Sequence, residues 1–198
     1  MNEMDAEAAV DPIALFRVWM KLAEESEPND PGAVALATAT RDGFPSVRMV
    51  LMKQADQRGF SFYTNAESQK GLELAENPRA AMCFHWKSLR RQVRISGKVS
   101  ELSAAEADDY FRSRSRLSQL GAVGSQQSRV LASRELLMAR VKELEEKFPE
   151  EIPRPGYWRG YVLRPERIEF WIGREGRLHD RILFLRSDEG WCREWLFP

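Results

Sequence analysis

Alternating hydrophobic and polar positions predict a chain built mainly of short strands that are joined by tight turns. We expect strands at residues 33–40, 46–53, 60–64, 80–86, 92–102, 157–163, 168–172, 177–185 and 191–196. Turn sequences such as Arg41-Asp42-Gly43-Phe44 and Gln57-Arg58-Gly59 separate several of them, and short turns favour antiparallel pairing. The pattern therefore predicts a closed or nearly closed antiparallel barrel, Greek-key-like, with helices packed outside it.

Segments with apolar residues at helical spacing lie before the first strand, in the middle of the chain and before the last strands. Asp11 and Pro12 suit the N-cap and first turn of a helix, and Ser103 with Glu106 fits a capping box. Further helical segments are expected at 68–76, within 113–128, and at 129–147, where an apolar stripe comprises Val130, Leu137, Val141, Leu144 and Phe148. The fold class is therefore α+β, with a disordered tail at 1–10 and a single domain at 11–198.

Charge and cysteine content exclude several classes of protein. The 198 residues include 30 Lys and Arg and 30 Asp and Glu, so the net charge is zero, unlike that of a general nucleic-acid binder. Cys83 and Cys192 form no disulfide framework and match no metal spacing, which favours a reduced, cytoplasmic protein without a metal site. We expect no signal peptide and no membrane span.

Four stretches carry candidate binding chemistry, and each also has a simpler structural explanation. Ser68-Gln69-Lys70 could form a phosphate cradle at a helix start, or could serve only to start the helix. The arginines and serines of 110–118 could bind a second phosphate or form a solvated loop. Residues 48–53 could be a core strand with snorkelling cations at its ends, and the amides of 126–128 could contact a heterocycle.

The stretch from Trp171 to Arg181 is the most informative. If residues 177–185 form a strand, Arg177, His179 and Arg181 share one face, because side chains alternate along a strand. Such a row suits water, facing carboxylates or a bound anion, and Trp171 offers a flat surface nearby. His85 is expected to be packed in an apolar strand. No dinucleotide fingerprint, P-loop, HExxH or GxSxG motif occurs. Since no Ser-His-Asp arrangement and no acid/base pair of carboxylates can be recognised either, we expect a bound cofactor to perform the chemistry.

Several motifs in this order resemble the pyridoxamine 5'-phosphate oxidase family. They are Arg48-Met49-Val50-Leu51-Met52-Lys53, Phe62-Tyr63-Thr64-Asn65, Tyr110-Phe111-Arg112-Ser113-Arg114, Arg164-Pro165-Glu166-Arg167-Ile168-Glu169-Phe170-Trp171 and Arg177-Leu178-His179-Asp180-Arg181. The resemblance runs from about Phe16 to Pro198 and implies a homodimer of FMN-binding split barrels, with FMN between the subunits.

The resemblance also implies residue roles. FMN contacts would be Arg48, Met49, Val50, Leu51, Met52, Lys53, Tyr63, Thr64, Gln69, Lys70, Gln92, Gln127, Ser128, Trp171 and Arg181. Substrate contacts would be Lys53, Tyr110, Arg114, Ser118, Arg177 and His179, with Arg177 and His179 as the catalytic pair. The family often has arginine at the position of Gln69, so we expect a looser flavin in this chain.

The implied reaction is the oxidation of pyridoxamine or pyridoxine 5'-phosphate to pyridoxal 5'-phosphate, a step of vitamin B6 synthesis and salvage. Dioxygen would be the acceptor, giving hydrogen peroxide, and the amine would also release ammonia. The alternative is a non-catalytic split-barrel protein that binds flavin, haem or pyridoxal phosphate. A weaker reading is an enzyme of the same fold that uses another substrate or a deazaflavin.

Overall fold

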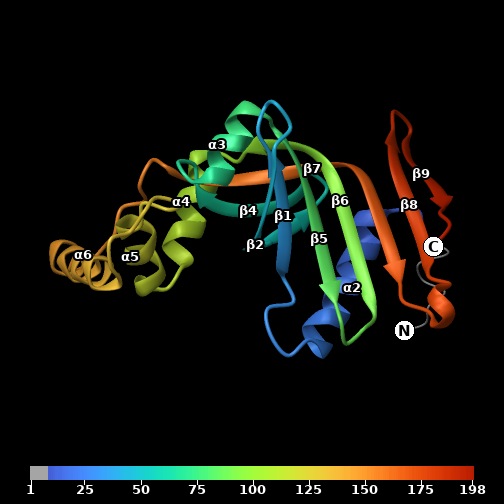
Figure 1. Ribbon diagram of the computed structural model, residues 1–198, viewed down its shortest axis with the longest axis horizontal. Helices are drawn as coiled ribbons and strands as arrows, with labels where there is room; N and C mark the ends of the chain where they lie inside the picture. Colours follow the sequence, from blue (N-terminus) through green and yellow to red (C-terminus); the bar gives the residue numbers. More distant parts are fainter. Residues whose placement is uncertain (1–8) are drawn as a thin grey trace.

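The computed structural model describes residues 9–198, and their main feature is one nine-stranded antiparallel sheet (Figure 1). The strands are β1 (Ala33–Ala39), β2 (Pro45–Leu51), β3 (Gln54–Asp56), β4 (Gly59–Asn65), β5 (Arg79–Trp86), β6 (Arg91–Glu101), β7 (Trp158–Ile172), β8 (Asp180–Ser187) and β9 (Gly190–Trp195). The helices are α2 (Pro12–Ser26), α3 (Gln69–Glu76), α4 (Ala104–Ser113), α5 (Arg116–Gly124) and α6 (Arg134–Lys147), with a 3₁₀ turn, η1, at Glu175–Arg177.

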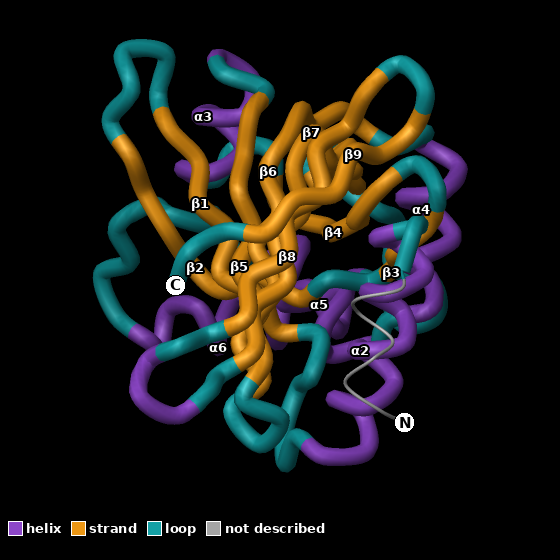
Figure 2. The backbone as a smooth tube through the Cα atoms, turned by 90° about the vertical axis from the view of Figure 1, so that its right-hand side faces the viewer, coloured by secondary structure: helices purple, strands orange, loops and turns teal. Residues whose placement is uncertain are grey.

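The sheet curls into a split barrel, the fold that the family resemblance implied, whereas the strand pattern alone predicted a closed or nearly closed barrel. Its main path runs β2-β1-β5-β6-β7-β4-β3, and β8 pairs with β7 and β9 outside that path. Only Met52 and Lys53 separate β2 from β3, so the two ends of the path must approach each other. The Lys53 N–H donates to the Ser61 carbonyl oxygen of β4 at 2.9 Å, which brings the end of β2 against the other side of the sheet. Figure 2 shows the strands at the centre and helices around them.

Helix α2 fills the hollow of this sheet. Asp11 caps its first turn by accepting from the Ile13 N–H at 2.8 Å, as the sequence predicted. The Phe16 ring lies 4.8 Å from the Phe60 ring, and the Trp19 ring lies 5.0 Å from the Phe170 ring, both edge to face. These side chains are at most 2% exposed, so α2 and the inner faces of the strands form one aromatic core.

Helices α4, α5 and α6 extend from one end of the barrel, far from β8 and β9 at the other end (Figure 1). The predicted capping box of α4 is present, with Ser103 and Glu106 exchanging hydrogen bonds. A second apolar cluster joins these helices to the start of β7 through Phe111, Leu120, Ile152 and Trp158. Helix α4 lies beside β4, with Tyr110 stacked on Tyr63, and α6 packs on α5.

The structure corrects the predicted strand boundaries near the C-terminus. The two strands expected at 157–163 and 168–172 are one strand, β7, which continues through Pro165. Proline lacks an N–H group, but here it lies opposite Gly97 at a register shift in β6, where a ladder hydrogen bond is not required. A short strand, β3, was not expected because three residues carry too little pattern.

Two other expectations differ from the structure. The helix predicted at 129–147 begins at Arg134, with Ser133 as its N-cap, and Val130 of the proposed apolar stripe is fully exposed. His85 is exposed on β5 and not packed in the core. Of the tail predicted at 1–10, residues 1–8 lie outside the described residues.

Candidate functional site

A cavity of about 830 Å³ opens beside β2, β4 and the helices α3 to α5. Most of the expected FMN and substrate residues line it, and we call it the α3–α5 cavity. The expected residues on its wall are Arg48, Met49, Val50, Leu51, Lys53, Tyr63, Thr64, Lys70, Tyr110, Arg114, Ser118 and Gln127. Segments from residue 48 to residue 127 meet here because β4 lies between the end of β2 and the α4–α5 wall.

Lys70 is a buried cation near the start of α3. Only 7% of the residue is exposed, and its Nζ donates to Gln127 Oε1 at 2.8 Å and to Thr64 Oγ1 and Ser68 Oγ at 3.2 Å. These partners are neutral oxygens, so they do not neutralise the charge. Burial, with the nearby charge of Arg48, lowers the pKa of Lys70 to about 8. The site therefore presents a poorly compensated ammonium and a helix N-terminus, a combination that favours an anion.

A second cationic side chain of the cavity wall, Arg114, lies against an aromatic stack. The rings of Tyr63 and Tyr110 are stacked with centroids 4.1 Å apart, and Trp158 lies parallel to them. The Arg114 guanidinium lies 5.0 Å from the Trp158 ring, and its buried Nη1 has no hydrogen-bond partner among residues 9–198. Burial lowers the pKa of Arg114. An unpaired buried N–H is costly, so this atom is suited to a ligand oxygen.

Four more candidates lie at the far end of β7 and β8. Directly paired positions put Gln92, Trp171 and Arg181 side by side on one face of the sheet. The Arg181 Nε donates to Glu169 Oε1 at 2.8 Å, and the His179 ring lies 4.5 Å from the Trp171 ring. The His179 Nδ1 accepts from the Arg174 N–H at 3.1 Å, which leaves Nε2 as the nitrogen for a ligand.

The predicted row of Arg177, His179 and Arg181 on one strand face is wrong. Strand β8 begins at Asp180, and Arg177 belongs to the η1 turn with a φ of 61°. This left-handed backbone breaks the alternation of an extended chain. Arg177 is exposed in the turn, while Arg181 is held by the buried carboxylate of Glu169.

One chain does not bring all the candidates together. Residues of α4 and α5 line the α3–α5 cavity. These helices lie at the opposite end of the molecule from the turn after β7 (Figure 1). Near the cavity, Gln69 directs its amide to Glu73 Oε1 at 3.0 Å, and its N–H donates to Ser128 Oγ at 3.2 Å. Met52, Gln69 and Ser128 do not line the cavity.

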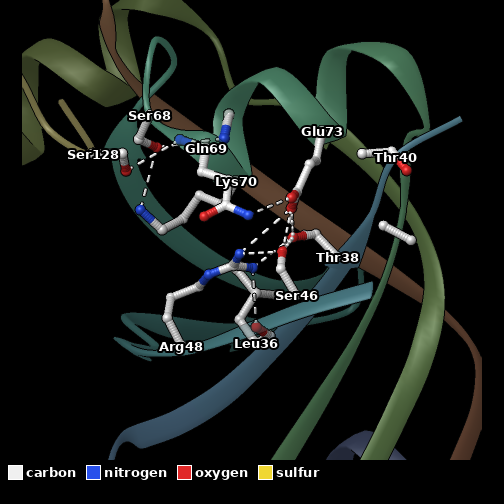
Figure 3. Close-up of polar contacts among 12 residues, drawn as sticks. Leu36, Thr38, Thr40, Ser46, Arg48, Ser68, Gln69, Lys70, Glu73 and Ser128 are labelled. Atoms are coloured by element: carbon white, nitrogen blue, oxygen red, sulfur yellow. Dashed lines mark hydrogen bonds and ion pairs between the residues drawn. The ribbon is translucent and has the colours of Figure 1, made fainter. Parts of the chain in front are cut away.

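Sequence reasoning missed a polar cluster behind Arg48 (Figure 3). Glu73 is 4% exposed and accepts hydrogen bonds from Thr38, Ser46 and Gln69. The signals were present but weak: Ser46 and Arg48 alternate on one strand face, and Gln69 and Glu73 are four residues apart on a helix. Neither spacing shows that a strand and a helix meet at one carboxylate.

Comparison with known proteins identifies the family. Residues 22–148 match the family model described as pyridoxamine 5'-phosphate oxidase, and residues 158–198 match the model of the pyridoxine 5'-phosphate oxidase C-terminal dimerisation region. The chain belongs to the pyridoxamine 5'-phosphate oxidase family. The resemblance seen in the sequence and the expectation of an enzyme are therefore confirmed.

Relatives within the pyridoxamine 5'-phosphate oxidase family are similar over nearly the whole chain. The pyridoxine/pyridoxamine 5'-phosphate oxidase of Gluconobacter oxydans (strain 621H) is 57% identical over 189 residues, which cover 95% of this chain and 94% of that protein. The protein of the same name from Erythrobacter litoralis (strain HTCC2594) is 55% identical and covers 95% of this chain and 91% of that protein.

Solved structures agree with the split-barrel fold of this family. PhzG from Burkholderia lata 383, solved with tetrahydrophenazine-1-carboxylic acid, superposes with a TM-score of 0.93 at 34% identity, covering 100% of this chain and 98% of that chain. A pyridoxamine 5'-phosphate oxidase-related, FMN binding protein from Nostoc punctiforme PCC 73102 has a TM-score of 0.76 at 17% identity, over 96% and 100% of the two chains. In residues 9–198 no helix is long and apolar enough to cross a bilayer.

Proposed function

We propose that this chain is an FMN-dependent oxidase that converts pyridoxamine and pyridoxine 5'-phosphate to pyridoxal 5'-phosphate, with dioxygen as acceptor. One observation carries the proposal: the wall of the α3–α5 cavity holds two cationic side chains, Lys70 and Arg114, together with the stacked rings of Tyr63 and Tyr110. A phosphorylated cofactor and a phosphorylated substrate require two such cations. The names of the relatives agree with this assignment.

The region around Lys70 fits the phosphate of FMN. Among residues 9–198, the hydrogen-bond partners of the buried ammonium are neutral oxygens, and Arg48 lines the same cavity. A phosphate dianion would restore the charge balance and accept charge-assisted hydrogen bonds. Gln69 supplies no cation here, which supports the expectation of weaker FMN binding. When bound, the flavin supplies the chemistry of accepting a hydride equivalent from the substrate and being reoxidised by dioxygen.

The region around Arg114 fits the phosphate of the substrate. Arg114 Nη1 is a donor with no partner in the described part of the chain, and Lys53 Nζ lies 5.7 Å from the centroid of the Tyr110 ring. Ser118 lines the cavity in the first turn of α5, where helix N–H groups favour an anion. We infer that Lys53, Tyr110, Arg114 and Ser118 bind the phosphate and so position the ring of the substrate.

We propose that the chain works as a homodimer. In this dimer, the candidate residues near the end of β7 and the start of β8 would reach the cavity of the other subunit. Trp171, Arg181 and Gln92 would then contact the flavin, and Arg177 and His179 the substrate, all from the other subunit. Two observations support this. Within one chain, these residues lie at the opposite end of the molecule from α4 and α5, whose residues line the cavity. Strand β2 also carries two exposed apolar side chains, Val47 at 69% and Met49 at 62% exposure. The model matched by residues 158–198 is a dimerisation region. With Nδ1 occupied by the Arg174 N–H, His179 would hold or move a proton at Nε2.

PhzG provides the competing assignment, because that relative was solved with a tricyclic carboxylic acid. The two cationic side chains favour phosphorylated substrates over such an acid. A non-catalytic flavin binder would not need Arg114 and Ser118 in addition to the Lys70 region.

Turnover tests the proposal. Purified protein supplied with FMN and pyridoxamine 5'-phosphate should form pyridoxal 5'-phosphate while consuming dioxygen. A tetrahydrophenazine carboxylate should not be oxidised at a comparable rate. Binding of FMN without any turnover of phosphorylated substrate would favour the non-catalytic alternative.

A further inference from the structure

Glu73 places a buried negative charge beside the cavity proposed for the cofactor phosphate (Figure 3). Its Oε2 accepts from Ser46 Oγ at 2.6 Å and from Thr38 Oγ1, and lies 3.4 Å from Arg48 Nη2. Its Oε1 accepts from the Gln69 amide at 3.0 Å. Burial alone would raise the pKa of Glu73, but these hydrogen bonds and the charge of Arg48 lower it. Glu73 is therefore ionised at neutral pH.

The hydroxyl groups of Thr38 and Ser46 each bridge Glu73 and Arg48. Arg48 Nη1 donates to Leu36 O at 3.3 Å and to Thr38 Oγ1, and Nη2 donates to Ser46 Oγ as well as to Glu73. Each hydroxyl that accepts from Arg48 also donates to Glu73. The terminal N–H groups of Arg48 thus all have acceptors in the protein, so the guanidinium has one favoured orientation.

We propose that Glu73 is a positioning residue for the cofactor phosphate, holding Arg48 at the cavity wall through Thr38 and Ser46. The remaining Nε–H and the positive charge of Arg48 then face a phosphate that Lys70 also binds. This inference depends on the proposed function, because it assumes that FMN binds with its phosphate beside Lys70. Gln69, which carries no charge, adds a fourth hydrogen bond to this carboxylate.

Two other roles for Glu73 predict different results. If Glu73 only anchors α3 to β1 and β2, its loss destabilises the fold and affects every flavin equally. If its charge mainly repels the phosphate, its neutralisation tightens FMN binding. A positioning role instead predicts weaker binding that requires both the phosphate and Arg48.

The test compares FMN with riboflavin, which lacks the phosphate, on the full chain freed of flavin. Binding is followed by quenching of flavin fluorescence. In Glu73→Gln the dissociation constant for FMN should rise about tenfold, the loss of one charge-assisted hydrogen bond, while that for riboflavin stays within about twofold. Glu76→Gln is the matched control, since Glu76 is an exposed carboxylate on the same helix. Its effect on either flavin should be less than about twofold.

A second arm uses Arg48. In an Arg48→Ala background, Glu73→Gln should no longer weaken FMN binding, because the group that Glu73 positions is gone. Should Glu73→Gln fail to fold by circular dichroism, Ser46→Ala removes one connecting hydroxyl and should weaken FMN but not riboflavin, by about threefold.

Equal weakening of both flavins, tighter FMN binding, or an undiminished effect in the Arg48→Ala background would overturn the inference. Failure of the proposed function has a different signature. In that case the unaltered chain would bind neither flavin, or would bind riboflavin as tightly as FMN.

Discussion

Arg114→Ala is the sharpest test of the proposed substrate site. The change removes a guanidinium at the C-terminal end of α4 (Ala104–Ser113), whose buried Nη1 has no hydrogen-bond partner within residues 9–198. A hydrogen bond to a charged group contributes about 1.5–3 kcal/mol, so losing one to the substrate phosphate should raise KM about 10- to 150-fold. Because the phosphate is bound equally in the ground and transition states, kcat should change little.

The stability of the free protein should hardly change in this variant. Truncation loses the cation–π contact with Trp158, about 0.5–2 kcal/mol, but also removes an unsatisfied buried donor that costs about 1–3 kcal/mol. The two effects are of similar size and opposite sign. The melting temperature should therefore stay within a few degrees of that of the unaltered chain.

Steady-state kinetics with two substrates provides the assay. Pyridoxamine 5'-phosphate should show the increase in KM, whereas pyridoxamine without the phosphate should be oxidised equally poorly by both proteins. An unchanged KM for the phosphorylated substrate, or a fall in melting temperature that matches the loss of activity, would refute the assignment of Arg114.

Three further predictions concern turnover, pH and packing. Arg177→Asn should lower kcat about 10²-fold without lowering the melting temperature, because asparagine tolerates the φ of 61° at this position. An unchanged rate of flavin reduction in stopped-flow kinetics would contradict the role of Arg177. Because the pKa of Lys70 is about 8, Lys70 loses its proton as the pH rises through that value, and FMN affinity should fall above pH 8 by at most about tenfold per pH unit. A flat dissociation constant between pH 7 and about 9.5 would argue against a phosphate at Lys70. Gly97→Ala should lower the free energy of unfolding, measured in urea melts, by about 1–3 kcal/mol. The reason is that the added Cβ would lie 2.0 Å from the Arg164 carbonyl oxygen. Unaltered stability would contradict the close approach of β6 and β7 at this position.

Local sequence patterns predicted most elements because each depends on neighbouring residues. Asp11 and Ser103 are N-caps as expected, and nearly every strand lies within two or three residues of its predicted bounds. The errors arise where a distant segment decides the structure. Strand β7 continues through Pro165 because β6 changes register opposite it.

The candidate site shows the same division. The motifs identified Arg48, Lys70 and Arg114, and the structure brings all three to one cavity. The role of Glu73 could not be predicted, because a glutamate on a short helix is usually solvated and only the fold buries it against β1 and β2. The backbone conformation of Arg177 could not be predicted either, since the alternation of side chains along a strand does not reveal a left-handed residue in a turn.

The visible absorbance of bound flavin reports directly whether the phosphorylated substrate reduces it. The purified chain is loaded with FMN, freed of dioxygen and mixed with pyridoxamine 5'-phosphate. We expect the visible flavin absorbance to bleach, pyridoxal 5'-phosphate to form in equal amount, and the colour to return on admission of air. Flavin that stays oxidised with excess substrate would contradict the claim that this cavity oxidises a phosphorylated pyridoxine.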